Sequence, residues 1–207
     1  MVRTSKSIKS DIAALADREP AFARVVKQLG VPEPRSGKPG AHTLLRTIVG
    51  QQVSVAAARS MWSKLEAAYG APPDLEAILK ASDEELRLAG ISRQKAGYAR
   101  SLAGLVLSGE LRLDALPGDD EEAVALLTKI KGIGRWSAEI YLLFAEGRAD
   151  IWPAGDLAVQ IEIGRILGHE ARPSEKLTRE LAEAWRPHRG AAAILAWHHY
   201  ASDMKVV

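Results

Sequence analysis

The segment from Leu127 to Ala138 constrains the fold of this chain more than any other. Within it, Gly132 and Gly134 flank Ile133 and separate two stretches with the apolar spacing of helices. Glycine tolerates positive φ and lets a backbone approach a ligand closely. The N–H groups at the start of the following helix suit an anionic oxygen. The segment therefore predicts two helices joined by a tight hairpin that can hold a phosphate.

Helical patterns cover most of the remaining chain, and strand-like alternation is scarce. Ser54 and Gly70 bracket one expected helix, and Ser82 with Glu85 forms a capping box. The expected helices cover about residues 10–16, 20–29, 42–49, 54–69, 82–90, 92–107, 120–127, 136–144, 157–167, 174–185 and 188–203. The basic segment 1–9 is expected to be a solvated arm, and the Pro- and Gly-rich segment 30–40 a loop. The fold class is therefore predicted to be all-α.

Composition excludes several classes of protein. Cysteine is absent, which rules out disulfides and a cysteine-bound iron–sulfur cluster. No apolar run is long enough to span a membrane, and the basic first residues are not expected to be a signal peptide. His198 and His199 lack the spacing of a metal motif, so no catalytic metal is expected. The net charge of +2 indicates an anionic partner only weakly.

A short series of residues follows the hairpin in a fixed order: Trp136-Ser137-Ala138, then Pro153, Gly155 and Asp156. Together with the hairpin, this series resembles the helix-hairpin-helix DNA glycosylase (HhH-GPD) superfamily. The tryptophan at position 136 resembles the 3-methyladenine DNA glycosylase II type of that superfamily.

The resemblance extends over about residues 41–202, which is most of the chain. It implies a two-lobed helical bundle that contains the helix-hairpin-helix motif and a DNA-binding cleft between the lobes. We accordingly expect an N-terminal helical extension and loop over residues 1–40, packed on a glycosylase core over residues 41–207.

The hairpin is expected to bind a DNA phosphate, a contact that positions the duplex and carries no sequence information. The residues assigned to it are Lys131, Gly132, Ile133, Gly134 and Arg135. The resemblance also implies a monovalent cation, Na⁺ or K⁺, held by the backbone carbonyls of Ile130 and Gly132. Residues 88–96 look like a weaker copy of the hairpin; they form either a second DNA contact or an ordinary corner between two helices.

Asp156 is the expected catalytic residue. It follows a loop and precedes an apolar helical run, so it also suits the N-cap position of a helix. The two roles are compatible, because the N-terminal end of a helix favours an anion. When an N-glycosidic bond breaks, positive charge develops at C1′, and a fixed carboxylate stabilises it. The same carboxylate can orient or deprotonate the attacking water.

The resemblance places Trp136 and Trp197 in the base pocket, together with Ile140 and Leu157. Flipped bases are held against aromatic or apolar walls, and an indole face attracts a cationic alkylated base. The alternative is that both tryptophans fill the core. In relatives, tyrosines stand at the positions of Ile140 and Leu157, so this pocket is expected to be less aromatic. Lyase-capable relatives carry a Schiff-base lysine at the position of Trp136, so no strand cleavage is expected.

The segment Ile48–Ser54 resembles the loop with which these enzymes fill the gap left by a flipped base. The resemblance assigns the wedge to Gln52, while Gln51 is expected to hold the loop and contact the DNA backbone near the lesion. Ser54 is expected to cap the following helix. A plain polar loop before a helix is the alternative, but it does not explain two adjacent glutamines.

These residues predict a base excision repair glycosylase that flips an alkylated base, such as 3-methyladenine, out of double-stranded DNA. It hydrolyses the N-glycosidic bond and leaves an abasic site, without lyase activity. We expect a monomer without a cofactor, in the cytoplasmic nucleoid of a bacterium or the nucleus of a eukaryote. Two alternatives stay open: a non-catalytic helix-hairpin-helix DNA-binding module, and a glycosylase for an oxidised or mismatched base.

Overall fold

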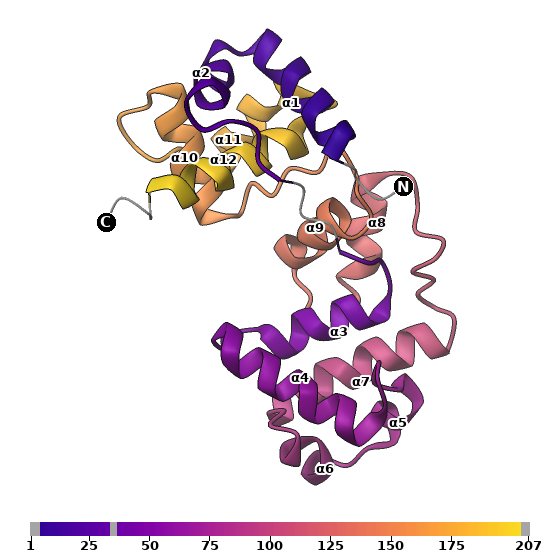
Figure 1. The fold of residues 1–207 in the computed structure, drawn as a ribbon. Coiled ribbons are helices and arrows are strands. Elements are labelled where there is room, and N and C mark those ends of the chain that lie inside the picture. The colour runs from indigo at the N-terminus through magenta and orange to yellow at the C-terminus, as the bar shows by residue number, and fades with distance from the viewer. Residues whose placement is uncertain (1–4, 34–36, 204–207) are drawn as a thin grey trace. The chain divides into compact units, whose positions relative to one another are not determined.

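The computed structural model describes residues 5–33 and 37–203 of the 207-residue chain. These residues form twelve α-helices, one 3₁₀ helix and no strand, which confirms the all-α fold class (Figure 1). The helices fall into two compact units, one made of Met1–Gly37 with Leu142–Val207 and the other of Lys38–Tyr141. None of the described helices is long and apolar enough to cross a membrane.

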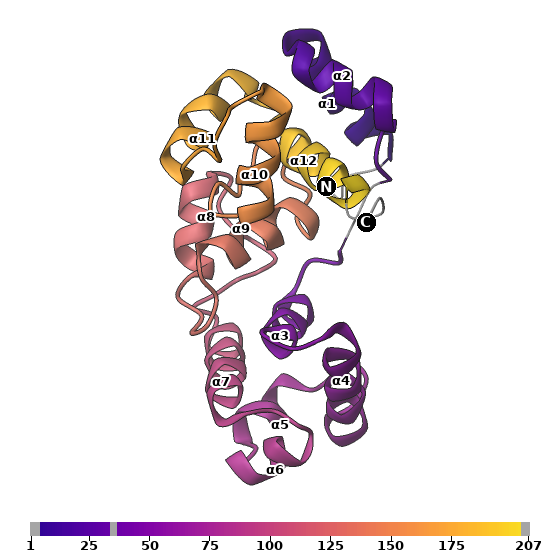
Figure 2. The same cartoon turned by 90° about the vertical axis from the view of Figure 1, so that its left-hand side faces the viewer.

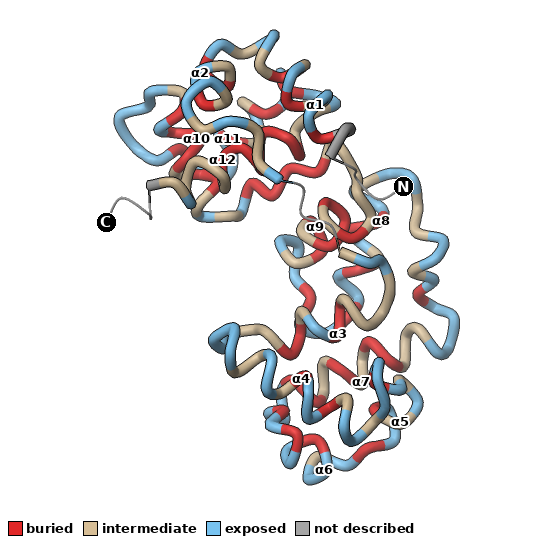
Figure 3. Tube along the Cα trace, viewed as in Figure 1, coloured by how far each residue is buried: buried red, intermediate tan, exposed pale blue. Residues whose placement is uncertain are grey.

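The unit Lys38–Tyr141 is built around α7. It contains α3 (Ala41–Gly50), α4 (Val55–Tyr69), α5 (Leu75–Lys80), α6 (Asp83–Leu88), α7 (Arg93–Leu107), α8 (Asp120–Leu127) and the start of α9 (Arg135–Phe144). The central helix α7 packs against α3, α5 and α6. The fully buried Leu45 and Ile48 of α3 and Leu102 of α7 belong to this core, whose buried positions are red in Figure 3.

The other unit is built around α12. It contains α1 (Ser5–Arg18), α2 (Pro20–Leu29), the end of α9, α10 (Leu157–Leu167), α11 (Glu175–Ala182), η1 (Glu183–Trp185) and α12 (Arg189–Asp203). All six residues 191–196 are buried, because α12 packs against α1, α2 and α10. Figures 1 and 2 show indigo α1 and α2 beside yellow α12, although the two ends of the chain are far apart in sequence.

Most helix starts predicted from capping residues are present. The side chains of Ser54, Ser92 and Ser174 each accept a backbone N–H from the first turn of the helix that they precede. Both hydrogen bonds of the capping box between Ser82 and Glu85 are formed. These signals are local, so the sequence alone is sufficient to locate them.

Three sequence predictions differ from the structure. The segment 1–9 was expected to be an arm, but α1 begins at Ser5, and residues 1–4 lie outside the described part. Ile8 explains the longer helix, because it extends the buried stripe of Ile12 and Leu15 by one turn. Helix α5 was not predicted, although Asp74 caps it. The helix expected over 174–185 ends at Ala182, and η1 follows it. The boundary between an extension 1–40 and a core 41–207 stays a prediction.

Candidate active site and DNA-contacting loops

Asp156 is the N-cap of α10, as predicted. Its carboxylate oxygen Oδ1 accepts the backbone N–H of Val159 at 2.9 Å. The loop before it is tied down, because the Asp156 N–H donates to the Pro153 carbonyl at 2.9 Å. In addition, the Gln160 side chain donates to the Ala154 carbonyl at 2.7 Å. The carboxylate therefore stands in a defined place at the positive end of an 11-residue helix.

Trp197 joins Asp156 directly. Its indole Nε1–H donates to Asp156 Oδ1 at 3.2 Å, across 41 residues of sequence. The ring is half-buried on α12 and lies 5.6 Å, centroid to centroid, from the ring of Phe144. One indole thus orients the candidate catalytic carboxylate and also offers an aromatic surface beside it.

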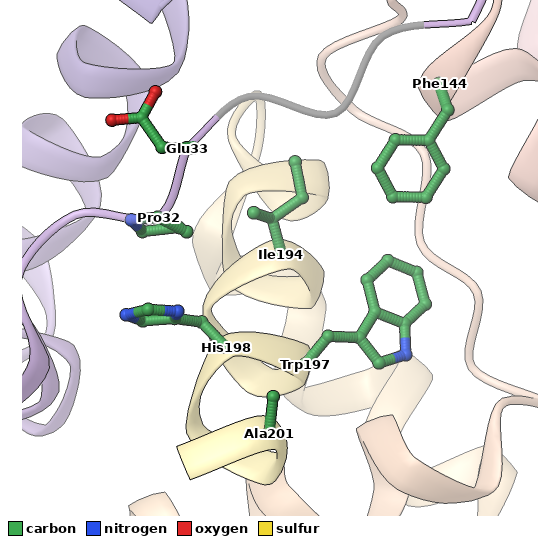
Figure 4. A pocket seen from close by; sticks show the side chains of 7 residues that line it. All are labelled: Pro32, Glu33, Phe144, Ile194, Trp197, His198 and Ala201. Carbon is green, nitrogen blue, oxygen red and sulfur yellow. The ribbon is translucent and has the colours of Figure 1, made fainter.

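Trp197 also lines a pocket (Figure 4). Its walls come from the loop after α2, the end of α9 and one side of α12. The lining residues are Pro32, Glu33, Phe144, Ile194, Trp197, His198 and Ala201. Sequence reasoning did not assign Phe144, Pro32 or Glu33 to a pocket. Only the tertiary fold brings that loop to α12.

The other expected pocket residues lie in different surroundings. Leu157 directly follows Asp156 and is 56% exposed. Trp136, at the start of α9, is 47% exposed, and Ile140, one turn later, is half-buried. Trp136 and Ile140 belong to the unit Lys38–Tyr141, whereas Leu157 and Trp197 belong to the other unit. A pocket shared by all four residues therefore stays a prediction.

The hairpin has the tight turn that its glycines predict. The Ile133 N–H donates to the Ile130 carbonyl at 3.0 Å, and Gly132 has a φ of 83°. A Cβ on Gly132 would lie 2.2 Å from Tyr98 Cδ2, so only glycine fits against this ring. The Lys131 N–H donates to Ser101 Oγ at 3.1 Å. Helix α9 starts at Arg135, so the N–H groups of its first turn have no partners within the helix.

Arg135 has carboxylate partners of its own. Its guanidinium donates to Glu121 at 2.8 Å and to the buried Glu139 at 2.9 Å. The hydrogen bonds with Glu121, followed by the charge of Glu139, raise the pKa of Arg135. The predicted role of Arg135 at a phosphate stays a prediction, and these two carboxylates offset much of its charge.

The predicted wedge loop is attached to the hairpin. Gln51 Nε2 donates to the Gly132 carbonyl at 2.8 Å, across 81 residues of sequence. Gln52 is exposed and has a φ of 54°, a left-handed conformation that is unusual for a residue with a side chain. Ser54 Oγ accepts the Ala57 N–H at 3.2 Å and starts α4. Ser54 caps α4 as predicted, whereas contact of Gln51 with the DNA backbone and insertion of Gln52 into DNA stay predictions.

Four arginines outside the hairpin are paired with carboxylates of the protein. Arg186 and Arg189 both contact Asp150, at 2.7 and 3.0 Å. Similarly, Arg93 and Arg100 both contact Asp83, at 3.3 and 2.7 Å. Such pairs offset charge that would otherwise face an anionic partner.

Within residues 5–33 and 37–203, no group of three or more His, Cys, Asp or Glu side chains could hold a metal ion. The two hairpin carbonyls expected to hold a monovalent cation each have a protein donor. Ile130 accepts the Ile133 N–H, and Gly132 accepts the Gln51 side chain. A carbonyl oxygen has a second lone pair, so a cation remains compatible with both contacts.

Residues 45–187 match the family model described as HhH-GPD superfamily base excision DNA repair protein. Because this match spans more than half of the sequence, the chain belongs to the HhH-GPD superfamily.

The named relatives point to one type within that superfamily. DNA-3-methyladenine glycosylase 1 of Schizosaccharomyces pombe is 30% identical over 183 residues, which is 85% of this chain and 80% of the relative. A putative DNA-3-methyladenine glycosylase of Bacillus subtilis is 26% identical over 162 residues. That similarity spans 74% of this chain but only 56% of the Bacillus protein. These relatives confirm the predicted 3-methyladenine DNA glycosylase type.

Solved structures share the fold. The DNA-3-methyladenine glycosidase of Bacillus halodurans has a TM-score of 0.86 and 27% identity, covering 94% of this chain and 91% of that chain. A Schizosaccharomyces pombe 3-methyladenine DNA glycosylase in complex with abasic DNA has a TM-score of 0.77 and 28% identity, covering 91% and 95%. The helix-hairpin-helix fold predicted from the sequence is thereby confirmed.

Proposed function

We propose that this protein is a base excision repair DNA glycosylase that removes alkylated bases, such as 3-methyladenine, from double-stranded DNA. It hydrolyses the N-glycosidic bond and leaves an abasic site. The observation that carries the proposal is the Asp156 carboxylate, which is fixed at the start of α10 by the N–H groups of Val159 and Trp197. The names of the relatives support the reaction, and the S. pombe complex supports DNA as the partner.

The proposed hydrolysis depends on the fixed position of the Asp156 carboxylate. As the base departs, the sugar acquires positive charge at C1′, and a preorganised anion stabilises that charge where it develops. An alkylated purine is already cationic, so it leaves without a strong acid to protonate it. Water then attacks C1′, and Asp156 is the residue that orients it or takes its proton.

Binding of the base needs surfaces that tolerate its charge. The indole of Trp197 and the ring of Phe144 line the pocket of Figure 4 and can attract a cationic heterocycle. Leu157, which directly follows Asp156, is proposed as a further base contact. An alkylated base has lost pairing or stacking strength, so flipping it costs less than flipping a normal base.

The hairpin and the wedge loop are proposed to hold the duplex. The backbone of Gly134 and the first turn of α9 bind a phosphate, with Lys129 and Lys131 adding positive charge beside them. A monovalent cation on the Ile130 and Gly132 carbonyls would strengthen this contact. Gln52 fills the space that the flipped base vacates. The protein acts as a monomer and needs no other cofactor.

The proposed enzyme differs from a lyase because it cleaves the N-glycosidic bond without cutting the DNA strand. Trp136 stands where a lyase carries its lysine, so no amine is present there to form a Schiff base. On an end-labelled methylated duplex, we expect strand breaks only after treatment with hot alkali. Breaks without alkali would indicate lyase activity, and no breaks above an enzyme-free control would favour a DNA-binding module.

A further inference from the structure

Lys95 is a buried cation in an apolar setting. It is 9% exposed on α7, and the side chains around it include Leu45, Ile48 and Leu86. An ammonium group has three donors, and among the described residues the structure gives it one acceptor, the Val49 carbonyl at 2.7 Å. Burial lowers the pKa of Lys95. Burying a charge here is unfavourable. A lysine at this position therefore indicates a role that an apolar side chain could not fill.

The hydrogen bond from Lys95 reaches the end of α3. Val49 is the penultimate residue of that helix, so its carbonyl has no partner in the helix ladder. A cationic donor at this point satisfies the carbonyl and complements the negative end of the helix. The bond therefore fixes the place where residues 50–54 leave α3.

The same loop holds Gln52 in a strained conformation. A left-handed φ is unfavourable for a residue with a Cβ, so it persists only where neighbours impose it. Two contacts hold the chain just before Gln52. Lys95 Nζ donates to the Val49 carbonyl, and Gln51 Nε2 donates to the Gly132 carbonyl.

Helix α7 also contacts the hairpin. Tyr98 covers Gly132, and Ser101 Oγ accepts the Lys131 N–H. Lys95, Tyr98 and Ser101 follow one another at intervals of three residues on one helix. One helix therefore sets the position of both loops that are proposed to touch DNA.

We infer that Lys95 is a positioning residue, whose bond to the Val49 carbonyl presets the Gly50–Ser54 loop so that Gln52 can fill the gap beside a flipped nucleotide. The inference rests on the proposed function of that loop. A side chain held in its bound conformation loses less entropy on insertion. The preference for abasic over intact DNA should therefore depend on the hydrogen bond between Lys95 and the Val49 carbonyl.

The test is a binding measurement that needs no catalysis. The wild type, Lys95→Met and Lys95→Arg bind a duplex with a tetrahydrofuran abasic analogue and the same duplex without it. The preference is the ratio of the two affinities. Losing a charged hydrogen bond is expected to lower the preference of Lys95→Met about tenfold. Lys95→Arg, which keeps a cationic donor, should keep most of it.

Gln52→Ala gives the reference for a lost wedge. We expect Lys95→Met combined with Gln52→Ala to show the same preference as Gln52→Ala alone, because the hydrogen bond of Lys95 acts through Gln52. Thermal unfolding of each variant is followed beside binding, since general destabilisation lowers both affinities and leaves their ratio unchanged.

Each outcome decides one statement. If Lys95→Met is folded and keeps the preference within about twofold of the wild type, Lys95 is not a positioning residue. If Gln52→Ala keeps the wild-type preference, the wedge role and the inference both fail. If the wild type releases no base but the preference follows Lys95, the proposed reaction fails while the inference stands.

Discussion

Asp156 and Trp197 show what a single side chain contributes at this site. Oδ1 of Asp156 accepts both the Val159 N–H and the indole N–H, so one oxygen anchors the carboxylate to two helices. The capping role was predictable from sequence because it is local. The bond with Trp197 was not, because it joins α10 to α12 and depends on how those helices pack.

Trp197→Phe removes this N–H and keeps an aromatic ring. A less well-oriented carboxylate stabilises the transition state less, so kcat should fall about tenfold. The change in KM should be smaller, since a ring still faces the base. Single-turnover kinetics on a lesion-containing duplex measures both. A kcat within twofold of the wild type would show that the indole N–H does not orient Asp156.

Lys95→Met should not destabilise the protein at neutral pH. An isolated buried charge is costly, and an apolar side chain of similar volume is often neutral or stabilising. Because burial lowers the pKa of Lys95, the unfolded chain holds its proton to higher pH than the folded chain. The wild type should therefore gain stability relative to Lys95→Met as pH rises from the lowered pKa towards 10.5.

Urea unfolding of both proteins at pH 7 and in the alkaline range measures this difference. Lys95→Leu serves as a second apolar variant in case methionine packs poorly. If the free energy of unfolding of both variants falls by more than about 2 kcal/mol at pH 7, Lys95 stabilises the fold, and the expectation above is wrong.

The two glycines of the hairpin, Gly132 and Gly134, have different roles. Gly132 has positive φ and lies against Tyr98, whereas a Cβ on Gly134 would meet no heavy atom within 4 Å. Sequence reasoning treated the pair alike, because both stand in one turn. Only the position of α7 reveals which of them is needed for packing and which leaves open space for a ligand.

The two glycines therefore make a matched pair of variants. Gly132→Ala should destabilise the protein by more than about 2 kcal/mol, since the new Cβ overlaps Tyr98 and φ is unfavourable. Gly134→Ala should change stability by less than about 0.5 kcal/mol, yet weaken DNA binding by crowding the phosphate. Thermal unfolding and DNA titration separate the effects. Equal stability losses at both positions would contradict this assignment.

Sequence located the helices far better than the contacts between them. The start of α7 at Arg93 and its end at Leu107 follow from the Ser92 cap and the apolar spacing. The bonds between Gln51 and Gly132 and between Lys95 and Val49 join residues 81 and 46 positions apart. No local pattern encodes such pairs, so the supporting role of α7 becomes visible only in the structure.

At the scale of the whole molecule, charge is largely balanced within the protein. The net charge is +2, and Arg93, Arg100, Arg186 and Arg189 are paired with Asp83 or Asp150. Positive residues were identifiable from sequence, but their pairing was not, because their partners come from other elements. DNA binding should therefore involve few phosphates and depend only moderately on salt.

Lysines beside the hairpin should carry a measurable share of that salt dependence. Each phosphate contact contributes about 0.9 to the slope of log K against log salt concentration. Lys129→Ala combined with Lys131→Ala should therefore lower the slope by about 1–2. Arg186→Gln is the control, because Asp150 and Glu183 already balance this arginine, and its slope should stay near that of the wild type. If Arg186→Gln lowers the slope and the double lysine variant does not, the phosphate contact does not lie at the hairpin.

The central claim is that Asp156 drives removal of an alkylated base. The most direct test is chromatography of free bases released from methylated duplex DNA by the wild type and by Asp156→Asn in parallel. Asparagine keeps an oxygen to cap α10 but removes the charge, so we expect at least about 100-fold less release with unchanged DNA binding. Release of 3-methyladenine by the wild type alone is the predicted result. Equal release by both proteins, or none by either despite tight DNA binding, would contradict the claim.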